Sequence, residues 1–248
     1  VSSGDFTDAD TTVLHYLGFN TTRAPFNNAD LRRAVSLGID RAGCVSSFLM
    51  GHGTAAQLPV NPASPLYPKS LDAVYSPDSF TSAVTAAGFG SGSEPVSVTL
   101  LVNSENTHKQ SAAAKIAAAL STSALRVTVE AVPWSDFVSR LKSGRFDLYY
   151  GEYKMTADWD LTDLLSASGA NNYGRFSDAD FAALLTAERT ATGDGYTDAS
   201  AKLYEAFCRQ TPIAPICFAR GSMLTTSGAI EGLTPSLTDP FYNLQDWT

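Results

Sequence analysis

The feature that most constrains the fold is an alternation of strand and helix patterns in the centre of the chain. Residues 96–102 alternate apolar and other side chains as a half-buried strand does, and residues 112–120 carry apolar side chains at helical spacing. Residues 127–131 predict a second strand, 133–144 a second helix and 146–150 a third strand. Strands joined by helical crossovers pair in parallel, so this stretch predicts the centre of an α/β sheet.

The flanking segments supply further elements. Asp40 suits the N-cap of a helix, and Arg32 and Arg33 are expected on the polar face of the helix before it. Ser177 and Thr197 each precede an apolar helical pattern and predict helix starts. The expected strands are 13–19, 213–218 and 223–226, the other expected helices are 31–38, 45–49 and 78–88, and irregular chain is expected at 54–77 and 228–248.

Composition excludes several function classes. The chain has 248 residues and a formal net charge of −8, which argues against binding to nucleic acid or anionic lipid. Cys44, Cys208 and Cys217 lack metal-ligand spacing. Because the chain opens with Val1 rather than Met, we expect a processed form or a piece of a longer protein.

Catalytic signatures are absent from the sequence. The glycines of 88–92 follow a helix and precede a strand, which is the reverse of the order in a phosphate-binding loop. No GxSxG or HExxH motif occurs, and three scattered histidines predict neither a triad nor a metal site. A hydrolase that uses carboxylates such as Glu152 and Asp158 is the minor alternative.

The topology predicts where a ligand binds. In open parallel α/β sheets, ligands bind at the carboxyl ends of the strands, where loops and helix amino termini converge. The loops expected there are 103–108, the turn at Pro133 and Trp134, and 151–160. They combine aromatic, amide and carboxylate groups, which suits a ligand with a positive end and an apolar body.

Several stretches of the chain occur in an order and spacing that recur together in one family. They are Leu17-Gly18-Phe19-Asn20-Thr21, Pro25-Phe26-Asn27, Leu31-Arg32-Arg33-Ala34, Ile39-Asp40-Arg41, Asn106-Thr107-His108-Lys109, Trp134-Ser135-Asp136-Phe137, Gly144-Arg145-Phe146-Asp147 and Asn172-Tyr173-Gly174-Arg175-Phe176-Ser177. In register, these stretches resemble the peptide, oligopeptide and nickel solute-binding proteins of bacterial ABC importers (extracellular solute-binding proteins, family 5).

The resemblance implies the carboxy-terminal half of a two-lobed receptor, with a periplasmic-binding-protein-like α/β fold and a mixed, mainly parallel sheet flanked by helices. Residues 1–20 would form a crossover strand, 21–226 the second ligand-binding lobe with its core sheet at 96–150, and 227–248 an exit segment. The implied partners are a peptide ligand, membrane permease subunits and the missing amino-terminal lobe. The implied location is extracytoplasmic, in the periplasm or on the cell surface as a membrane-anchored lipoprotein. We expect a monomer that is not an enzyme and needs no cofactor or metal.

The resemblance also implies site residues. Ala157-Asp158-Trp159 is similar to a family motif whose aspartate pairs with the amino terminus of the peptide. Asp160 competes for this role, because Met155 and Asp160-Leu161 depart from the family pattern. The full set of expected ligand-binding residues is Asp158, Asp160, Trp159, Glu152, Tyr150, Tyr153, Trp134, Asn103 and Asn172.

Rival functions remain open at the level of sequence. A nickel chelate, haem or another small solute is the alternative ligand within the same family. A sensory or adhesive module that binds a ligand without transporting it has the same sequence signature.

Overall fold

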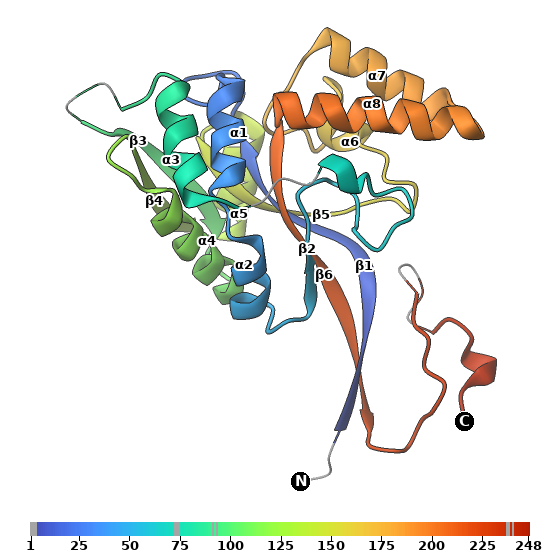
Figure 1. The fold of residues 1–248 in the computed structure, drawn as a ribbon. Helices are drawn as coiled ribbons and strands as arrows, with labels where there is room; N and C mark the ends of the chain where they lie inside the picture. Colours follow the sequence, from blue (N-terminus) through green and yellow to red (C-terminus); the bar gives the residue numbers. More distant parts are fainter. Residues whose placement is uncertain (1–3, 72–74, 91, 93, 237–238, 240) are drawn as a thin grey trace.

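The computed structural model describes residues 4–71, 75–90, 92, 94–236, 239 and 241–248, and Figure 1 shows their arrangement. A six-stranded sheet in the order β2-β6-β1-β5-β3-β4 forms the centre. Strand β3 (Val96–Asn103) pairs in parallel with β4 (Leu125–Val132) and with β5 (Leu148–Lys154). The predicted β-α-β-α-β core is therefore confirmed.

The other half of the sheet is antiparallel. The long strand β1 (Gly4–Phe19) pairs with β5 on one side and with β6 (Ile213–Thr226) on the other, and the short β2 (Gly53–Ala55) completes the β6 edge. The sheet is thus mixed as expected, but it is not mainly parallel, because the described strands make three antiparallel and two parallel pairings.

Helices cover both faces of the sheet (Figure 1). One face packs against α1 (Ala29–Leu37), α2 (Arg41–Phe48), α3 (Pro77–Ala86) and α4 (Thr107–Leu120). The opposite face packs against α5 (Trp134–Ser143), α6 (Thr162–Leu165), α7 (Ala179–Thr190) and α8 (Asp194–Gln210). Neighbours along a strand point to opposite faces, so Tyr149 belongs to one core and Tyr150 to the other. Short 3-10 helices lie at Lys69–Leu71 and Leu244–Asp246.

Helix starts follow their capping residues. Asp40 accepts from the Gly43 amide as predicted, and Asn106 accepts from the Lys109 amide and so begins α4. The starts predicted at Ser177 and Thr197 are displaced. Asp178 caps α7, and α8 already begins at Asp194 after Gly193. None of the described helices is long and apolar enough to cross a membrane.

Further predictions are wrong. The segment 54–77, which was expected to be irregular, contains the end of β2 and the 3-10 helix at Lys69–Leu71. The strand expected at 13–19 begins at Gly4, and the strands expected at 213–218 and 223–226 are one strand, because β1 and β6 continue as a ribbon that projects from the body (Figure 1). The third strand runs to Lys154, because β1 pairs with it up to that residue. Arg32 is buried rather than on the polar helix face, because its guanidinium binds the end of α8.

Candidate functional site

The candidate site lies where β3 and β5 separate at their carboxyl ends. The two strands pair only at Leu100 with Leu148 and at Leu101 with Tyr149, after which β5 continues along β1. The resulting opening is flanked by two pockets. Its position agrees with the edge that the topology rule predicts.

We call the first one the aromatic pocket. It has a volume of about 430 Å³. Its lining residues are Tyr16, Asn103, Lys109, Trp134, Phe137, Val138, Leu141, Lys142, Tyr149, Tyr150, Gly151, Glu152, Tyr153, Asn171 and Tyr173.

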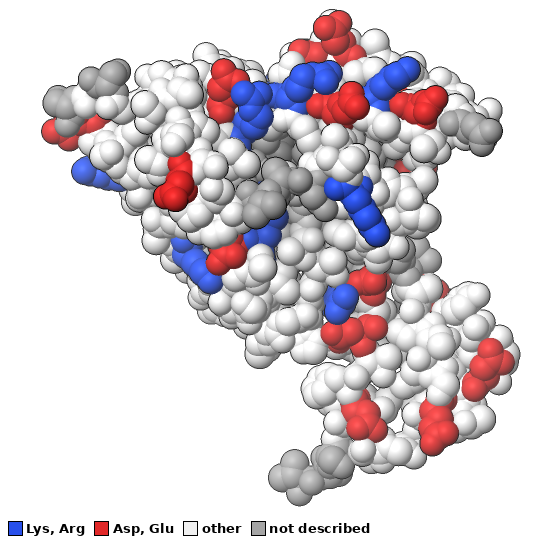
Figure 2. Space-filling view, in the orientation of Figure 1, with Lys and Arg blue, Asp and Glu red and all other residues white. Residues whose placement is uncertain are grey.

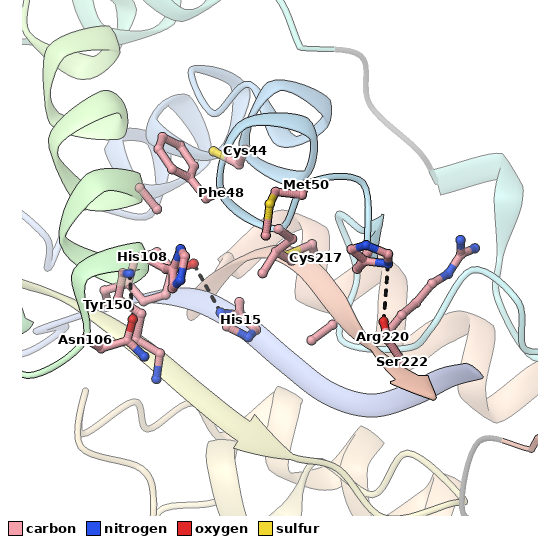
Figure 3. A pocket seen from close by; sticks show the side chains of 15 residues that line it. His15, Cys44, Phe48, Met50, Asn106, His108, Tyr150, Cys217, Arg220 and Ser222 are labelled. Carbon is pink, nitrogen blue, oxygen red and sulfur yellow. Dashed lines mark hydrogen bonds between the residues drawn. The ribbon is translucent and has the colours of Figure 1, made fainter. Parts of the chain in front are cut away.

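We call the second one the histidine pocket, which Figure 3 shows from close by. It has a volume of about 310 Å³. His15, Asn106, His108 and Tyr150 gather on one side of it, and the sulfur-bearing side chains Cys44, Met50 and Cys217 lie with Phe48 on another (Figure 3). The remaining lining residues are Leu49, His52, Lys109, Ala112, Ala219, Arg220 and Ser222.

A charged cluster joins the two pockets, because Lys109 and Tyr150 line both. The Lys109 Nζ lies 2.7 Å from Glu152 Oε2, and the His15 Nε2 lies 3.6 Å from the same oxygen. The other ring nitrogen of His15, Nδ1, lies 3.2 Å from the Tyr150 hydroxyl. Backbone geometry sets these contacts, because His15 is paired with Glu152 across β1 and β5, and Asn106 places Lys109 in the first turn of α4.

The environment of the cluster shifts its protonation equilibria. Burial lowers the pKa of His15 to about 4, with the positive charge of Lys109 adding to this effect and Glu152 opposing it. Burial alone would raise the pKa of Glu152, but the hydrogen bond and charge of Lys109 outweigh it and lower the pKa below its ordinary value. At neutral pH the cluster therefore holds an ammonium, a carboxylate and a neutral imidazole.

The aromatic pocket has a rigid wall and an exposed lip. The Tyr16 and Tyr149 hydroxyls lie 3.2 Å apart, and the two rings meet edge to face. At the lip, Trp134 is 57% exposed and stacks on Phe137 with a ring-centroid distance of 5.7 Å. The Trp134 amide donates to the Glu105 carboxylate, which fixes the start of α5.

The thiols of the histidine pocket are buried and protonated at neutral pH. Burial raises the pKa of Cys44 to about 11 and that of Cys217 to about 12. Among the described residues, no group of three or more His, Cys, Asp or Glu side chains is arranged to hold a metal ion.

The structure brings together five of the nine residues that the sequence predicts. Asn103, Trp134, Tyr150, Glu152 and Tyr153 all line the aromatic pocket. Glu152 and Tyr153 do so from within β5 and not from the predicted loop.

The other four predicted residues line neither pocket. Asp160 accepts from the Thr162 amide and lies 3.7 Å from Arg189, while both side-chain groups of Asn172 bind the backbone of its own loop. Trp159 is buried, and its indole N–H donates to the Ser64 hydroxyl.

Asp158 differs from these three because its side chain is exposed. Its backbone carbonyl accepts from the Tyr196 hydroxyl of α8 at 3.3 Å. The next residue, Trp159, has a left-handed backbone with φ of 62°, which a bulky residue adopts only where its surroundings impose it. The buried indole thus fixes a turn that leaves Asp158 at the surface.

Sequence reasoning missed Lys109 and His15. Lys109 carries a signal, since a polar cap at Asn106 puts it in the first turn of a helix at the ligand edge. His15 carries none, because only the pairing of β1 with β5 places it beside Glu152.

Comparison with known proteins gives a consistent result. The family model of the bacterial extracellular solute-binding proteins, family 5, matches residues 2–174. Heme-binding protein A of Haemophilus influenzae is 27% identical over 242 residues, which are 92% of this chain and 44% of that protein. The oligopeptide-binding protein AppA of Bacillus subtilis is 23% identical over 94% of this chain and 46% of its own length. The chain thus spans about half the length of the curated relatives it matches.

Solved structures share the fold. AppA of Bacillus subtilis in complex with a nonapeptide gives a TM-score of 0.80 at 21% identity, covering 98% of this chain and 52% of that one. HbpA2 of Haemophilus parasuis gives a TM-score of 0.85 at 20% identity, covering 99% of this chain and 50% of that one. NikZ of Campylobacter jejuni in complex with Ni(L-His) gives a TM-score of 0.81 at 14% identity, covering 99% of this chain and 53% of that one. The likeness confirms the periplasmic-binding-protein-like α/β fold.

Proposed function

Because the chain belongs to the bacterial extracellular solute-binding proteins of family 5, we propose that it is the second ligand-facing lobe of a peptide receptor for an ABC importer. In this proposal residues 1–20 form the crossover strand, 21–226 the lobe and 227–248 the segment that returns toward the first lobe. The receptor acts outside the cytoplasm, closes around its ligand and docks on a membrane permease.

The observation that carries the proposal is the charged cluster beside the aromatic pocket. A peptide combines charged termini with side chains of many shapes, and this edge offers an ammonium, a carboxylate and a largely aromatic wall within one opening. The relatives include proteins named for oligopeptides, di- and tripeptides, and murein peptides. Another relative is named for heme, and two similar structures hold Ni(L-His) or Ni(L-His)2, so a flat or chelated solute is the second candidate.

Three of the predicted site residues are carboxylates that could bind the amino group of the ligand. Glu152 is paired with Lys109 and Asp160 with Arg189, whereas Asp158 is exposed and makes no ion pair among the described residues. A free carboxylate binds an ammonium without first losing a partner, so we assign the amine to Asp158 and the ligand carboxylate to Lys109. Tyr150, Tyr153, Trp134 and Asn103 would contact the body of the peptide.

The electrostatics favour binding over turnover. A hydrolytic general acid needs a raised pKa, and the pKa of Glu152 is lowered because its charge is compensated by Lys109. On the face drawn in Figure 2, acidic and basic side chains intermingle, and this face shows no extended basic patch. This charge distribution suits a soluble receptor better than a nucleic-acid-binding protein.

The test compares tri-alanine, N-acetylated tri-alanine and tri-alanine amide as ligands of the full-length protein by calorimetry. Asp158→Asn is expected to weaken tri-alanine binding by about 10- to 100-fold and to leave binding of the acetylated form unchanged. Asp180→Asn, on the exposed first turn of α7, is the matched control. Equal affinity of the wild type and Asp158→Asn for tri-alanine would contradict the assignment of the amine.

A further inference from the structure

We propose that Lys109 and His15 compete for the carboxylate of Glu152. When a ligand carboxylate binds Lys109, Glu152 is left to pair with His15, and His15 takes up a proton. Ligand binding is therefore coupled to proton uptake. The ligand part of this inference rests on the proposed function. The competition itself is a property of the unliganded chain.

The competition follows from a shared acceptor. Both Lys109 Nζ and His15 Nε2 approach the same oxygen of Glu152, at 2.7 and 3.6 Å. Lysine holds the shorter contact, so the carboxylate charge is already compensated when a proton reaches the imidazole. A second cation at this point would face Lys109 in a partly buried site, where charge repulsion is only weakly screened.

The exchange needs movement of one side chain only. His15 lies on β1 between β5 and β6, directly opposite Glu152, and the Tyr150 hydroxyl holds its other nitrogen. Lys109 is long and flexible, and it lines both pockets. A ligand carboxylate in either pocket can therefore draw the ammonium away while the imidazole stays beside Glu152.

The protonation equilibria agree with this geometry. Burial is the main cause that lowers the pKa of His15 to about 4, and the charge of Lys109 lowers it further. Neutralising that ammonium with a ligand carboxylate removes the repulsion, and Glu152 then stabilises the imidazolium. The proton comes from solvent and forms an N–H bond on the His15 ring, so that the resulting imidazolium faces Glu152 with its Nε2–H and the Tyr150 hydroxyl with its Nδ1–H.

Other charged and titratable groups surround His15, but none of those described takes the place of Glu152 as its acidic partner. The Arg220 and His52 side chains, which line the same pocket, are paired with Asp10 at 3.0 Å and with Asp8 at 2.9 Å. The titratable and charged groups around His15 are Tyr150 and Glu152 from β5, Lys109 and His108 from α4, Cys217 and Arg220 from β6, Cys44 from α2, and His52 beside β2. Tyr150, Cys44 and Cys217 keep their protons at neutral pH, because burial raises the pKa of each of them.

The first test needs no ligand. The imidazole of His15 is titrated by NMR in the full-length protein with labelled histidine, and His15→Gln identifies its signal. Lys109→Met is expected to raise the pKa of His15 by about one unit, and Glu152→Gln to lower it. Lys202→Met is the control, because Lys202 is exposed on α8, lines neither pocket and makes no ion pair among the described residues. An unchanged His15 titration in Lys109→Met would overturn the inference.

The second test measures the proton. Calorimetry of tri-alanine binding at about pH 4.5, in buffers of different ionisation enthalpy, is expected to show uptake of about half a proton per ligand, because the pKa of His15 would rise from about 4 by about one unit. His15→Gln and the C-terminal amide of the ligand should each abolish the uptake. Binding of tri-alanine without uptake overturns the coupling. Failure of tri-alanine to bind contradicts the peptide function instead, and the NMR titration then decides the competition.

Discussion

Arg32 offers a sharp test of how the fold is stabilised. Its guanidinium donates to the carbonyls of Phe26, Gln210 and Thr211, and it therefore closes the carboxyl end of α8 against the start of α1. Burial lowers its pKa to about 10, so the group stays charged at neutral pH. Replacing Arg32 by Met leaves these carbonyls without a donor in a site that is 3% exposed.

The expected cost of Arg32→Met is about 3–5 kcal/mol of unfolding free energy, because each lost charged hydrogen bond contributes on the order of 1.5–3 kcal/mol and part of this is recovered by relaxation. Arg32→Lys should recover less than half of this loss, since an ammonium cannot reproduce the planar fork. The measurement is urea unfolding, with hydrogen exchange of the last turn of α8 as the local probe.

Arg33→Met is the matched control. Arg33 lies one position away on the same helix, exposed and paired with Asp30 at 2.6 Å. An exposed pair of this kind contributes less than about 1 kcal/mol. If the two Met variants unfolded at the same urea concentration, the structural role given to Arg32 would be refuted.

Three further outcomes are expected. Gly18→Ala should lower the unfolding free energy by about 1–3 kcal/mol, because the added Cβ would lie 2.0 Å from the buried ring of Tyr149. Gly195→Ala, whose added Cβ would meet open space within α8, should stabilise the fold slightly. Thermal unfolding compares the two variants, and equal effects would contradict this packing. The pKa of His15 is lower in the folded chain than its ordinary 6.5, so its contribution to stability is complete above that pH and is lost as the pH falls toward about 4. The loss in unfolding free energy should reach about 2.5 kcal/mol at pH 4.5, and urea unfolding of His15→Gln should show this part of the loss missing. Trp134→Ala should lower ligand affinity about tenfold and the unfolding free energy by less than about 1 kcal/mol, and unchanged affinity would remove it from the site.

The core of the fold was predictable because one physical rule generates it. Strands β3, β4 and β5 and the crossover helices α4 and α5 bury apolar side chains with periods of 2 and 3.6, and these periods are visible in the sequence. The helix start at Asp40 was predictable for the same reason, since its carboxylate acts within three residues of itself, whereas the starts predicted at Ser177 and Thr197 were displaced.

The ribbon of β1 and β6 was not predictable in full. Its outer part contains no buried residue over 4–8 and 219–226, so the apolar alternation that marks a half-buried strand is missing, and Phe6 and Leu224 are 64% and 65% exposed. The β1–β6 pairing joins residues more than 200 positions apart, from Gly4 with Thr226 to Asp10 with Arg220. No local pattern encodes such a pairing.

The candidate site was predicted in part. The strand-end rule located the edge, and five of the expected residues line its aromatic pocket. Which charged groups meet there depends on strand register and on the direction of a lysine side chain, so the sequence supplied Glu152 without Lys109 or His15. Arg32 shows the same limit, because helical spacing cannot tell a solvated arginine from one that binds a distant helix end.

The central claim is that this lobe holds a peptide with the missing lobe, and native mass spectrometry of the full-length protein, purified gently from its host, tests it most directly. The account predicts a set of co-purified masses that fragment as short peptides and that are lost in the Asp158→Asn, Lys109→Met double variant. A protein that carries only haem, a metal chelate or a sugar in both forms would contradict it.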